Sequence, residues 1–135
     1  PDRFQSVIQE MRIDLTLDRF LHRVPYEKTP EVYAACDILL KTSLLESFSY
    51  PPLEMMASGG YVVAVPNGGN LEYLKDGENC ILYPQGNLAE AKAAIERILT
   101  DAELRKKLDT GAEETVKERN WKRIEPQILE QYLGK

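Results

Sequence analysis

Two glutamates, Glu46 and Glu54, lie at the two ends of one short segment and are the side chains best placed to bind hydroxyl groups. A carboxylate accepts hydrogen bonds, so it can hold the hydroxyls of a ribose or of a hexose. We interpret Glu54 as the ligand of a ribose diol and Glu46 as the ligand of hexose hydroxyls. The spacing alone is weak evidence, because glutamate is common in this chain. The alternatives are an acid favoured by a helix N-terminus for Glu54 and a solvated loop residue for Glu46.

The segment between the two glutamates combines a loop with the start of a helix. Pro51 and Pro52 cannot lie inside a helix but suit its first turn. A helix N-terminus presents unpaired N–H groups and the positive end of its dipole, which together favour a phosphate. With Tyr50 as the cap, Tyr50 and Leu53 supply the remaining N–H donors, since proline has none. The Tyr50 side chain either packs beside a bound sugar or simply covers the helix entrance.

Short apolar runs alternate with helical patterns along the chain, which predicts a parallel α/β sheet. Ile38–Leu40 is a predicted strand just before the Glu46 loop, and Tyr61–Val65 is the clearest strand because it is apolar on both faces. Ligands bind beyond the carboxyl ends of strands in such sheets, which is where the Glu46 loop would lie. A further strand is predicted over 80–83, preceded by strand-like alternation over 15–21. Helices are predicted over 4–11, 29–36, 53–57, 88–99, 102–108, 112–119 and 124–132, with Thr29 as one N-cap.

Several other features have two interpretations each. Asn67-Gly68-Gly69-Asn70 either contacts a sugar or turns the chain after the central strand, and we favour the turn. Glu72 points into a binding cleft or lies on the surface. On the final helix, apolar side chains recur at helical spacing and indicate a stripe that packs on the core; they are Trp121, Ile124, Ile128 and Tyr132.

Composition limits the class of protein. Apolar residues make up 43% and charged residues 29% of 135 residues, as in one soluble domain. No apolar run approaches the roughly 18 residues of a membrane span. The chain begins Pro1-Asp2-Arg3 without a Met, which predicts that it is cut from a longer protein.

Charge and metal-binding residues exclude two further classes of function. The net charge of −5 argues against binding nucleic acid. The basic cluster at Arg105–Lys107 is surrounded by glutamates, which indicates a mixed-charge helix surface. Cys36 and Cys80 form no CxxC pair and are predicted to be buried free thiols in a reducing compartment. His22 is the only histidine, which excludes multi-histidine metal sites, and we expect it to be structural.

The run from Cys36 to Glu72 resembles the C-terminal domain of retaining glycosyltransferases of the GT-B fold (glycosyl transferases group 1, family 4). The resemblance extends from about Phe20 to Tyr132. The matching elements, in order, are Cys36-Asp37, Ile38–Leu40, Ser43, the E-x7-E motif from Glu46 to Glu54, Ala57-Ser58-Gly59, Tyr61–Val65, Gly68-Gly69, Glu72, Asp76–Asn79, Leu82 and Trp121.

The resemblance implies a Rossmann-like parallel sheet with helices on both faces and a helical C-terminus, as the nucleotide-sugar-binding half of a two-domain enzyme. It makes Glu46 a catalytic residue that holds the donor sugar and Glu54 the ribose ligand. It implies transfer with retention from a nucleotide-diphosphate sugar to a glycan or lipid-linked acceptor, with no metal and no cofactor. The substrate-binding residues would be Ser47, Phe48, Ser49, Tyr50 and Leu53 together with Glu54.

The same resemblance carries expectations about the whole protein. Residues 1–135 would be a single domain that lacks the N-terminal acceptor domain and is inactive alone. The enzyme would be cytoplasmic, at the inner face of the membrane in its full-length form, and would serve polysaccharide biosynthesis. The alternatives are a non-catalytic scaffold or interaction module of the same fold and another GT-B enzyme such as a nucleotide-sugar epimerase.

This chain departs from the family pattern at the centre of the motif. Ser47 and Ser49 replace two glycines that let the backbone approach the ligand, and serine fits there if its φ is negative. His22 and Cys80 also stand where glycine is common, and Thr42 replaces a frequent proline. The basic pair that clamps the diphosphate in the family has no counterpart upstream of residue 20.

Overall fold

The β-branched, apolar run at positions 61–64 forms the central strand of a parallel sheet. A computed structural model describes residue 21 and residues 23–134. The order of strands within this part is β1 (Ile38–Lys41), β2 (Tyr61–Ala64) and β3 (Ile81–Leu82), all parallel. Val62 lies opposite Leu39, and Val63 lies opposite Ile81. The three strands predicted over 38–40, 61–65 and 80–83 are therefore confirmed.

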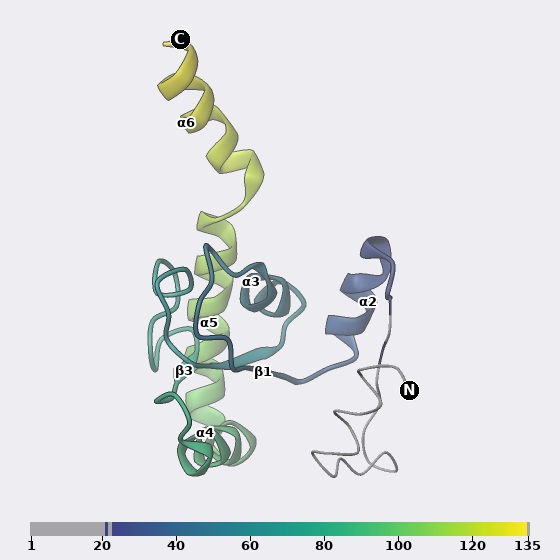
Figure 1. The fold of residues 1–135 in the computed structure, drawn as a ribbon, viewed down its shortest axis with the longest axis vertical. Helices are drawn as coiled ribbons and strands as arrows, with labels where there is room; N and C mark the ends of the chain where they lie inside the picture. Colours follow the sequence, from purple (N-terminus) through teal and green to yellow (C-terminus); the bar gives the residue numbers. More distant parts are fainter. Residues whose placement is uncertain (1–20, 22, 135) are drawn as a thin grey trace.

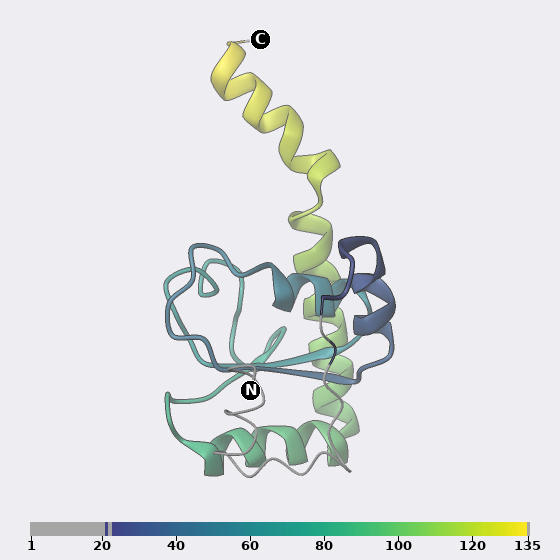
Figure 2. The ribbon, with the colours of Figure 1, turned by 45° about the vertical axis from the view of Figure 1, so that its right-hand side comes forward.

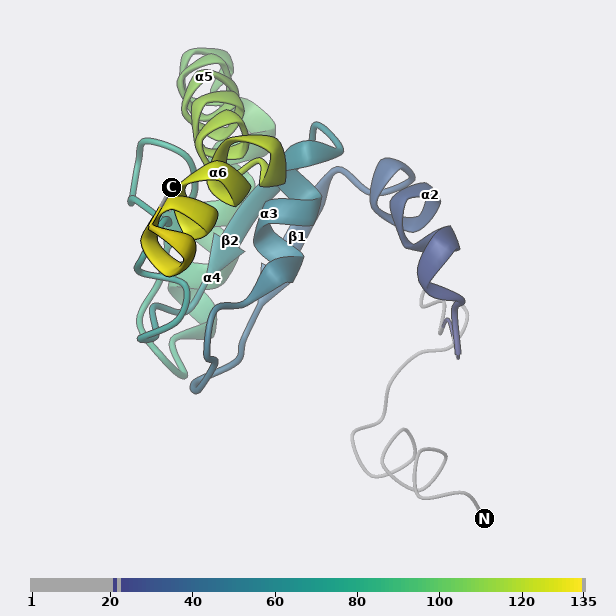
Figure 3. The same ribbon diagram turned by 90° about the horizontal axis from the view of Figure 1, so that it is seen from above.

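The central strand buries both of its faces because helices cover the sheet on either side (Figures 1 and 3). α3 (Tyr50–Ala57) packs on one face, where Val62 and Ala64 point, and α4 (Leu88–Thr100) packs on the other, where Val63 and Val65 point. α5 (Ala102–Glu118) contributes Leu108 to the second cluster and Ala112 to the first, so it spans both layers. This is the Rossmann-like α/β arrangement that the sequence predicted.

Local chemistry sets the helix boundaries. The side chain of Asn87 caps α4 and that of Asp101 caps α5, each accepting a backbone N–H three residues ahead. α3 ends at Ser58, and Gly59 follows with a φ of 82° that few other residues adopt cheaply.

Two helix predictions need correction. α2 (Thr29–Ala34) follows a 3₁₀ helix, η1 (Tyr26–Lys28), so Lys28 is its cap residue and Thr29 lies inside the first turn. α5 is one helix where two were predicted, and Gly111 lies in its middle. A Cβ at Gly111 would come within 2.3 Å of the Glu78 carbonyl oxygen, so this glycine admits a neighbouring turn instead of ending the helix.

The final helix, α6 (Trp121–Leu133), projects away from the sheet and its helices (Figures 1 and 2). α5 ends at Glu118 with Arg119 as its C-cap residue, and Asn120 caps α6 directly after it, so the chain changes direction there. The predicted packing stripe is wrong, because Trp121 is 66% and Tyr132 is 79% exposed. Its apolar residues have no core within reach in the described part of the chain.

The two cysteines have different environments. Cys80 is buried, as predicted, and burial raises the pKa of its thiol to about 12. Cys36 is exposed, because it lies between α2 and β1 and not on a packed face, so its predicted burial is wrong.

Some predictions lie outside the described residues, namely the opening helix over 4–11, most of the strand pattern over 15–21, and His22. None of the helices in the described part is long and apolar enough to cross a membrane.

Candidate functional site

The candidate site lies where the chain leaves the carboxyl ends of β1 and β2. Residues 42–49 lead from β1 into α3, and residues 65–70 follow β2. Because the two strands are neighbours and parallel, both loops emerge at the same edge of the sheet (Figure 2). Such an edge is the usual ligand-binding position in open parallel sheets.

Glu46 is paired with a lysine from the end of β1. Lys41 Nζ donates to Glu46 Oε1 and also to Ser43 Oγ, at 2.6 Å. The Lys41 side chain is 14% and the Glu46 side chain 28% exposed. The hydrogen bond from Lys41, with a contribution from Ser43, lowers the pKa of the Glu46 carboxyl below its usual value. Glu46 is therefore ionised at neutral pH, which makes it a strong hydrogen-bond acceptor.

The loop after β2 braces the Glu46 loop from the side. Asn67 Nδ2 donates to the Ser43 carbonyl oxygen at 2.9 Å. A Cβ at Gly69 would come within 2.5 Å of the Glu46 carbonyl oxygen, so only glycine permits this approach. Asn67 Oδ1 accepts the backbone N–H groups of Gly69 and Asn70, and Asn70 Nδ2 donates to the Val65 carbonyl. These contacts favour a structural turn, the alternative that the sequence analysis preferred for this loop.

Phe48 anchors the middle of the Glu46 loop in an aromatic cluster. Its ring centroid lies 5.1 Å from that of Tyr50 and 5.3 Å from that of Tyr73. The Arg119 guanidinium lies 5.9 Å from the same centroid, within the range of a cation–π contact. The Tyr73 hydroxyl also donates to the carbonyl oxygen of Ser49. Ser47, in contrast, is exposed.

Ser49 corrects two predictions about the entry into α3. Its φ is 70° and not the negative value on which we made the fit of serine depend, and it is the N-cap residue in place of Tyr50. With Ser49 as cap, the Leu53 N–H is the first that pairs within the helix, so Leu53 is not a free donor. The N–H groups of Ser49 and Tyr50 are the ones left at this helix end. Ser49 is 5% exposed, and its Oγ has no hydrogen-bond partner among the described residues.

Glu54 has its own partner on another element. Tyr33, on α2, donates its hydroxyl to Glu54 Oε2 at 3.1 Å. Burial, and then the hydrogen bond and charge of Glu54, raise the pKa of Tyr33 to about 12, so this phenol stays a donor. Glu46 and Glu54 thus flank one loop and helix start, with separate hydrogen-bond partners at the sheet edge and on α2.

Glu54 borders two surface hollows. One, of about 440 Å³, is lined on the α2 side by Tyr26, Pro30 and Tyr33. The other, of about 350 Å³, lies toward the end of α5 and is lined by residues that include Tyr50, Leu53, Arg119 and Trp121. Both hollows place apolar or aromatic surface beside a carboxylate, which is what a nucleoside requires: a stacking face and a hydroxyl acceptor.

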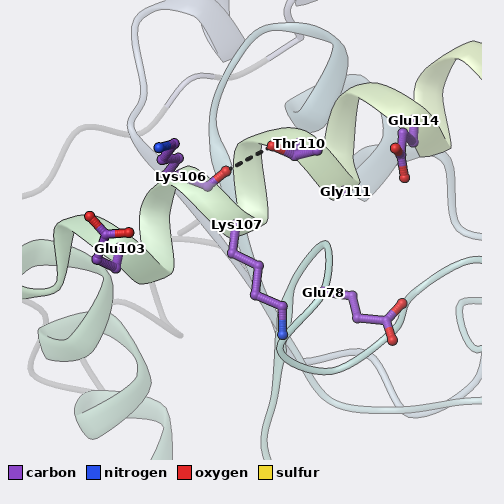
Figure 4. Close-up of a pocket in the computed structure, with 7 residues that line it drawn as sticks. All are labelled: Glu78, Glu103, Lys106, Lys107, Thr110, Gly111 and Glu114. Atoms are coloured by element: carbon purple, nitrogen blue, oxygen red, sulfur yellow. Dashed lines mark hydrogen bonds between the residues drawn. The ribbon is translucent and has the colours of Figure 1, made fainter.

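A further hollow lies along α5 and shares no residue with the Glu46 loop (Figure 4). Lysines and glutamates of α5 line it together with Glu78, so it carries both signs of charge. This is the mixed-charge helix surface that the sequence predicted. We assign no function to it.

Four residues of this site were not singled out in the sequence: Lys41, Tyr33, Tyr73 and Arg119. Arg119 Nη1 contacts Glu72 Oε1 at 2.5 Å, and its Nη2 donates to the Glu72 carbonyl at 3.0 Å. Tyr33 and Tyr73 contact their partners in the site 21 and 24 residues away along the chain, and Arg119 contacts Glu72 from 47 residues away, so local patterns gave no signal for them. For Lys41 a signal existed, because a lysine directly after the apolar run 38–40 departs from the apolar composition of strands in a parallel sheet.

Comparisons with known proteins show which proteins this chain is similar to. The family model described as "Glycosyl transferases group 1" matches residues 17–115. The O-antigen biosynthesis protein RfbC of Myxococcus xanthus is 35% identical over 117 residues, which are 84% of this chain and 9% of RfbC. The D-inositol 3-phosphate glycosyltransferase of Thermomonospora curvata is 30% identical over 134 residues, 99% of this chain and 31% of that protein.

Among solved structures, Anabaena HepE in complex with UDP-glucose superposes with a TM-score of 0.80 at 25% identity, covering 98% of this chain and 36% of HepE. The chain thus spans a tenth to about a third of the length of these three proteins.

Proposed function

The chain belongs to the glycosyl transferases group 1 family, and we propose that it is the nucleotide-sugar-binding part of a retaining glycosyltransferase of the GT-B fold. The observation that carries the proposal is the ionised Glu46 at the carboxyl edge of the sheet, followed eight residues later by Glu54 on the first turns of α3. HepE, which shares this fold, has been crystallised with UDP and with UDP-glucose. We therefore propose a UDP-sugar as the donor.

Each motif residue has a proposed role. Glu46 Oε1 is taken by Lys41, and its other oxygen would accept a hydroxyl of the donor sugar. Glu54 would accept a ribose hydroxyl while Tyr33 fixes the rotamer of its carboxylate. The free N–H groups of Ser49 and Tyr50, at the positive end of α3, would face the diphosphate. Ser47, Phe48 and Leu53 would line the donor.

The whole enzyme would transfer the sugar to a glycan or lipid-linked acceptor held by a further domain, in polysaccharide biosynthesis. Because catalysis needs both substrates in one cleft, we propose that the 135-residue chain binds the donor but does not turn it over. No cofactor or metal enters this scheme. The protein would work in the cytoplasm, with the full-length form at the inner face of the membrane.

One observation favours a second candidate, a non-catalytic module of the same fold. Ser49 adopts a φ of 70° with its side chain buried, at a position where the family pattern has glycine. If that side chain narrows the donor site, the chain would retain the fold without the ligand.

Ligand-detected NMR on the chain tests both candidates, with UDP, UDP-glucose, GDP, ADP, CDP and dTDP as probes. Binding by one domain of a cleft is weak, at a Kd of about 1 mM or roughly −4 kcal/mol, and this method tolerates it. We expect UDP and UDP-glucose to bind selectively. Glu54→Gln should weaken both ligands, and Glu46→Gln should weaken UDP-glucose alone.

Glu96→Gln is the matched control, because Glu96 is an exposed carboxylate on α4, which lies across the sheet from α3. It should leave both affinities unchanged. No binding of any probe by the unmodified chain would refute the donor-site proposal and favour the non-catalytic module. Selective binding of a nucleotide other than UDP would refute the proposed donor class.

A further inference from the structure

Lys41 is a nearly buried cation at the very end of β1. Its side chain is 14% exposed, and its neighbours along the strand are apolar. Burying an ammonium group is costly unless charge and hydrogen bonds compensate for the lost water. The burial of the Lys41 side chain therefore needs a reason that an exposed surface lysine would not need.

The ammonium group of Lys41 ties together two parts of the Glu46 loop. Its Nζ donates to Ser43 Oγ at 2.6 Å and to Oε1 of Glu46. Asn67 holds the same stretch from the other side through the Ser43 carbonyl, at 2.9 Å. The Glu46 carboxylate is thus fixed by a cation on a rigid strand, although Glu46 itself lies in a loop.

Stability alone does not explain the pair. A buried ion pair is often no more stabilising than apolar side chains of similar volume, because the desolvation cost offsets the attraction. Such a pair instead fixes the orientation of the carboxylate and keeps the carboxylate ionised. Both matter for a carboxylate that must accept a hydroxyl in one direction.

We propose that Lys41 is a positioning residue for donor-sugar recognition: it holds one oxygen of Glu46 so that the other oxygen is presented to a sugar hydroxyl. The inference rests on the proposed function of Glu46. It goes further by assigning selectivity for the sugar, as distinct from the nucleotide, to a residue that does not touch the ligand. Lys41 acts only through Glu46.

The test measures the affinities of UDP and UDP-glucose separately, so that the contribution of glucose is isolated. The quantity of interest is the Kd of UDP divided by the Kd of UDP-glucose. Lys41→Met should lower this ratio by about tenfold, the worth of one hydrogen bond to a charged group, and should leave the Kd of UDP unchanged. Lys41→Arg keeps the charge and should stay within about threefold of the unmodified chain.

A double-mutant cycle with Glu46→Gln separates positioning from other roles. If Lys41 acts through Glu46, Lys41→Met has no further effect on the ratio once Glu46 is Gln. The double variant also removes both charges of the pair, so it gives the comparison with Glu46→Gln even if Lys41→Met alone does not fold. Lys75→Met is the matched control, because the Lys75 side chain is exposed and its ammonium lies 4.0 Å from the Glu78 carboxylate.

The outcomes discriminate clearly. A lower ratio in Lys41→Met and an equal ratio in Glu46→Gln and the double variant support the inference. An unchanged ratio, a parallel loss of UDP binding, or a further loss in the double variant overturns it while leaving the proposed function intact. Failure of the unmodified chain to bind UDP or UDP-glucose overturns the proposed function itself, and this inference with it.

Discussion

Replacing Ser49 by glycine should stabilise the chain, although most substitutions of buried residues destabilise proteins. Ser49 has a φ of 70°, in the left-handed region, which costs an L-residue about 1–2 kcal/mol. Its buried Oγ has no partner among the described residues, and an unsatisfied buried polar group costs about 1–3 kcal/mol. Glycine removes both costs but loses roughly 0.5–1 kcal/mol through the greater freedom of the unfolded chain. The small void left by the removed side chain offsets a further part of the gain in stability.

The net expectation for Ser49→Gly is a gain of about 2 kcal/mol in the free energy of unfolding. Urea unfolding followed by circular dichroism measures it, as a rise of roughly 1 M in the midpoint with an unchanged slope. Ser47→Gly is the matched control, because Ser47 is exposed in the same loop and does not have a positive φ. It should lose about 0.5–1 kcal/mol. A Ser49→Gly variant no more stable than the unmodified chain, or an equal gain in Ser47→Gly, would refute the reasoning.

Three further predictions concern the contacts that hold the site. Gly69→Ala should destabilise the chain by about 1–3 kcal/mol, because the new Cβ would lie 2.5 Å from the Glu46 carbonyl oxygen. Gly68→Ala is the control and should change stability by less than about 1 kcal/mol, because a Cβ there has nothing within 4 Å. The midpoints of urea unfolding measure both effects, and equal effects would contradict the close approach at Gly69. Because the pKa of Glu46 is lowered in the folded chain, its ionisation contributes stability above the unfolded value of 4.5 that is lost as the pH falls through the folded value. The stability difference between the unmodified chain and Glu46→Gln should therefore shrink between pH 7 and pH 3, and a constant difference would show that the pairing is absent. Arg119→Lys should cost about 1 kcal/mol, because lysine lacks the planar fork that places two nitrogens against Glu72 while the group lies over the Phe48 ring. An unchanged urea midpoint would show that this ion pair does not contribute to stability.

The parts of the fold that depend on local pattern were predictable from the sequence. The apolar, β-branched run at 61–64 favours a strand buried on both faces, as observed. Pro51 and Pro52 lie in the first turn of α3, as predicted, although the helix begins at Tyr50 and not at residue 53. The positions of Glu46 and Glu54 in the fold were also predictable, because a loop that joins a strand to a helix at the edge of a sheet shows in the local sequence pattern. Their roles as ligands of a donor stay predictions.

The parts that depend on contacts across the chain were not predictable. The sequence predicted separate helices over 102–108 and 112–119, but α5 is one helix, and the lack of a side chain at Gly111 serves the packing of the Glu78 turn against it. Tyr33 and Arg119 gave no signal, since each meets its partner only after folding. The apolar side chains of α6 have a regular spacing, and spacing says nothing about whether a core lies within reach.

The positive φ of Ser49 illustrates how the site is maintained. A strained backbone persists only where its surroundings determine it, and here three contacts do so. Tyr73 holds the Ser49 carbonyl, Phe48 is held in the aromatic cluster beside it, and α3 begins directly after Ser49, at Tyr50, with Pro51 in its first turn. Glycine at this position would reach the same conformation without those restraints. In this chain, packing holds the left-handed conformation at position 49 that glycine would adopt without help. The geometry of the loop therefore depends on residues that lie behind the site. For this reason substitutions at Tyr73, which contacts Ser49 and Phe48 from the core side, should disturb the conformation of the Glu46 loop as strongly as substitutions in the loop itself.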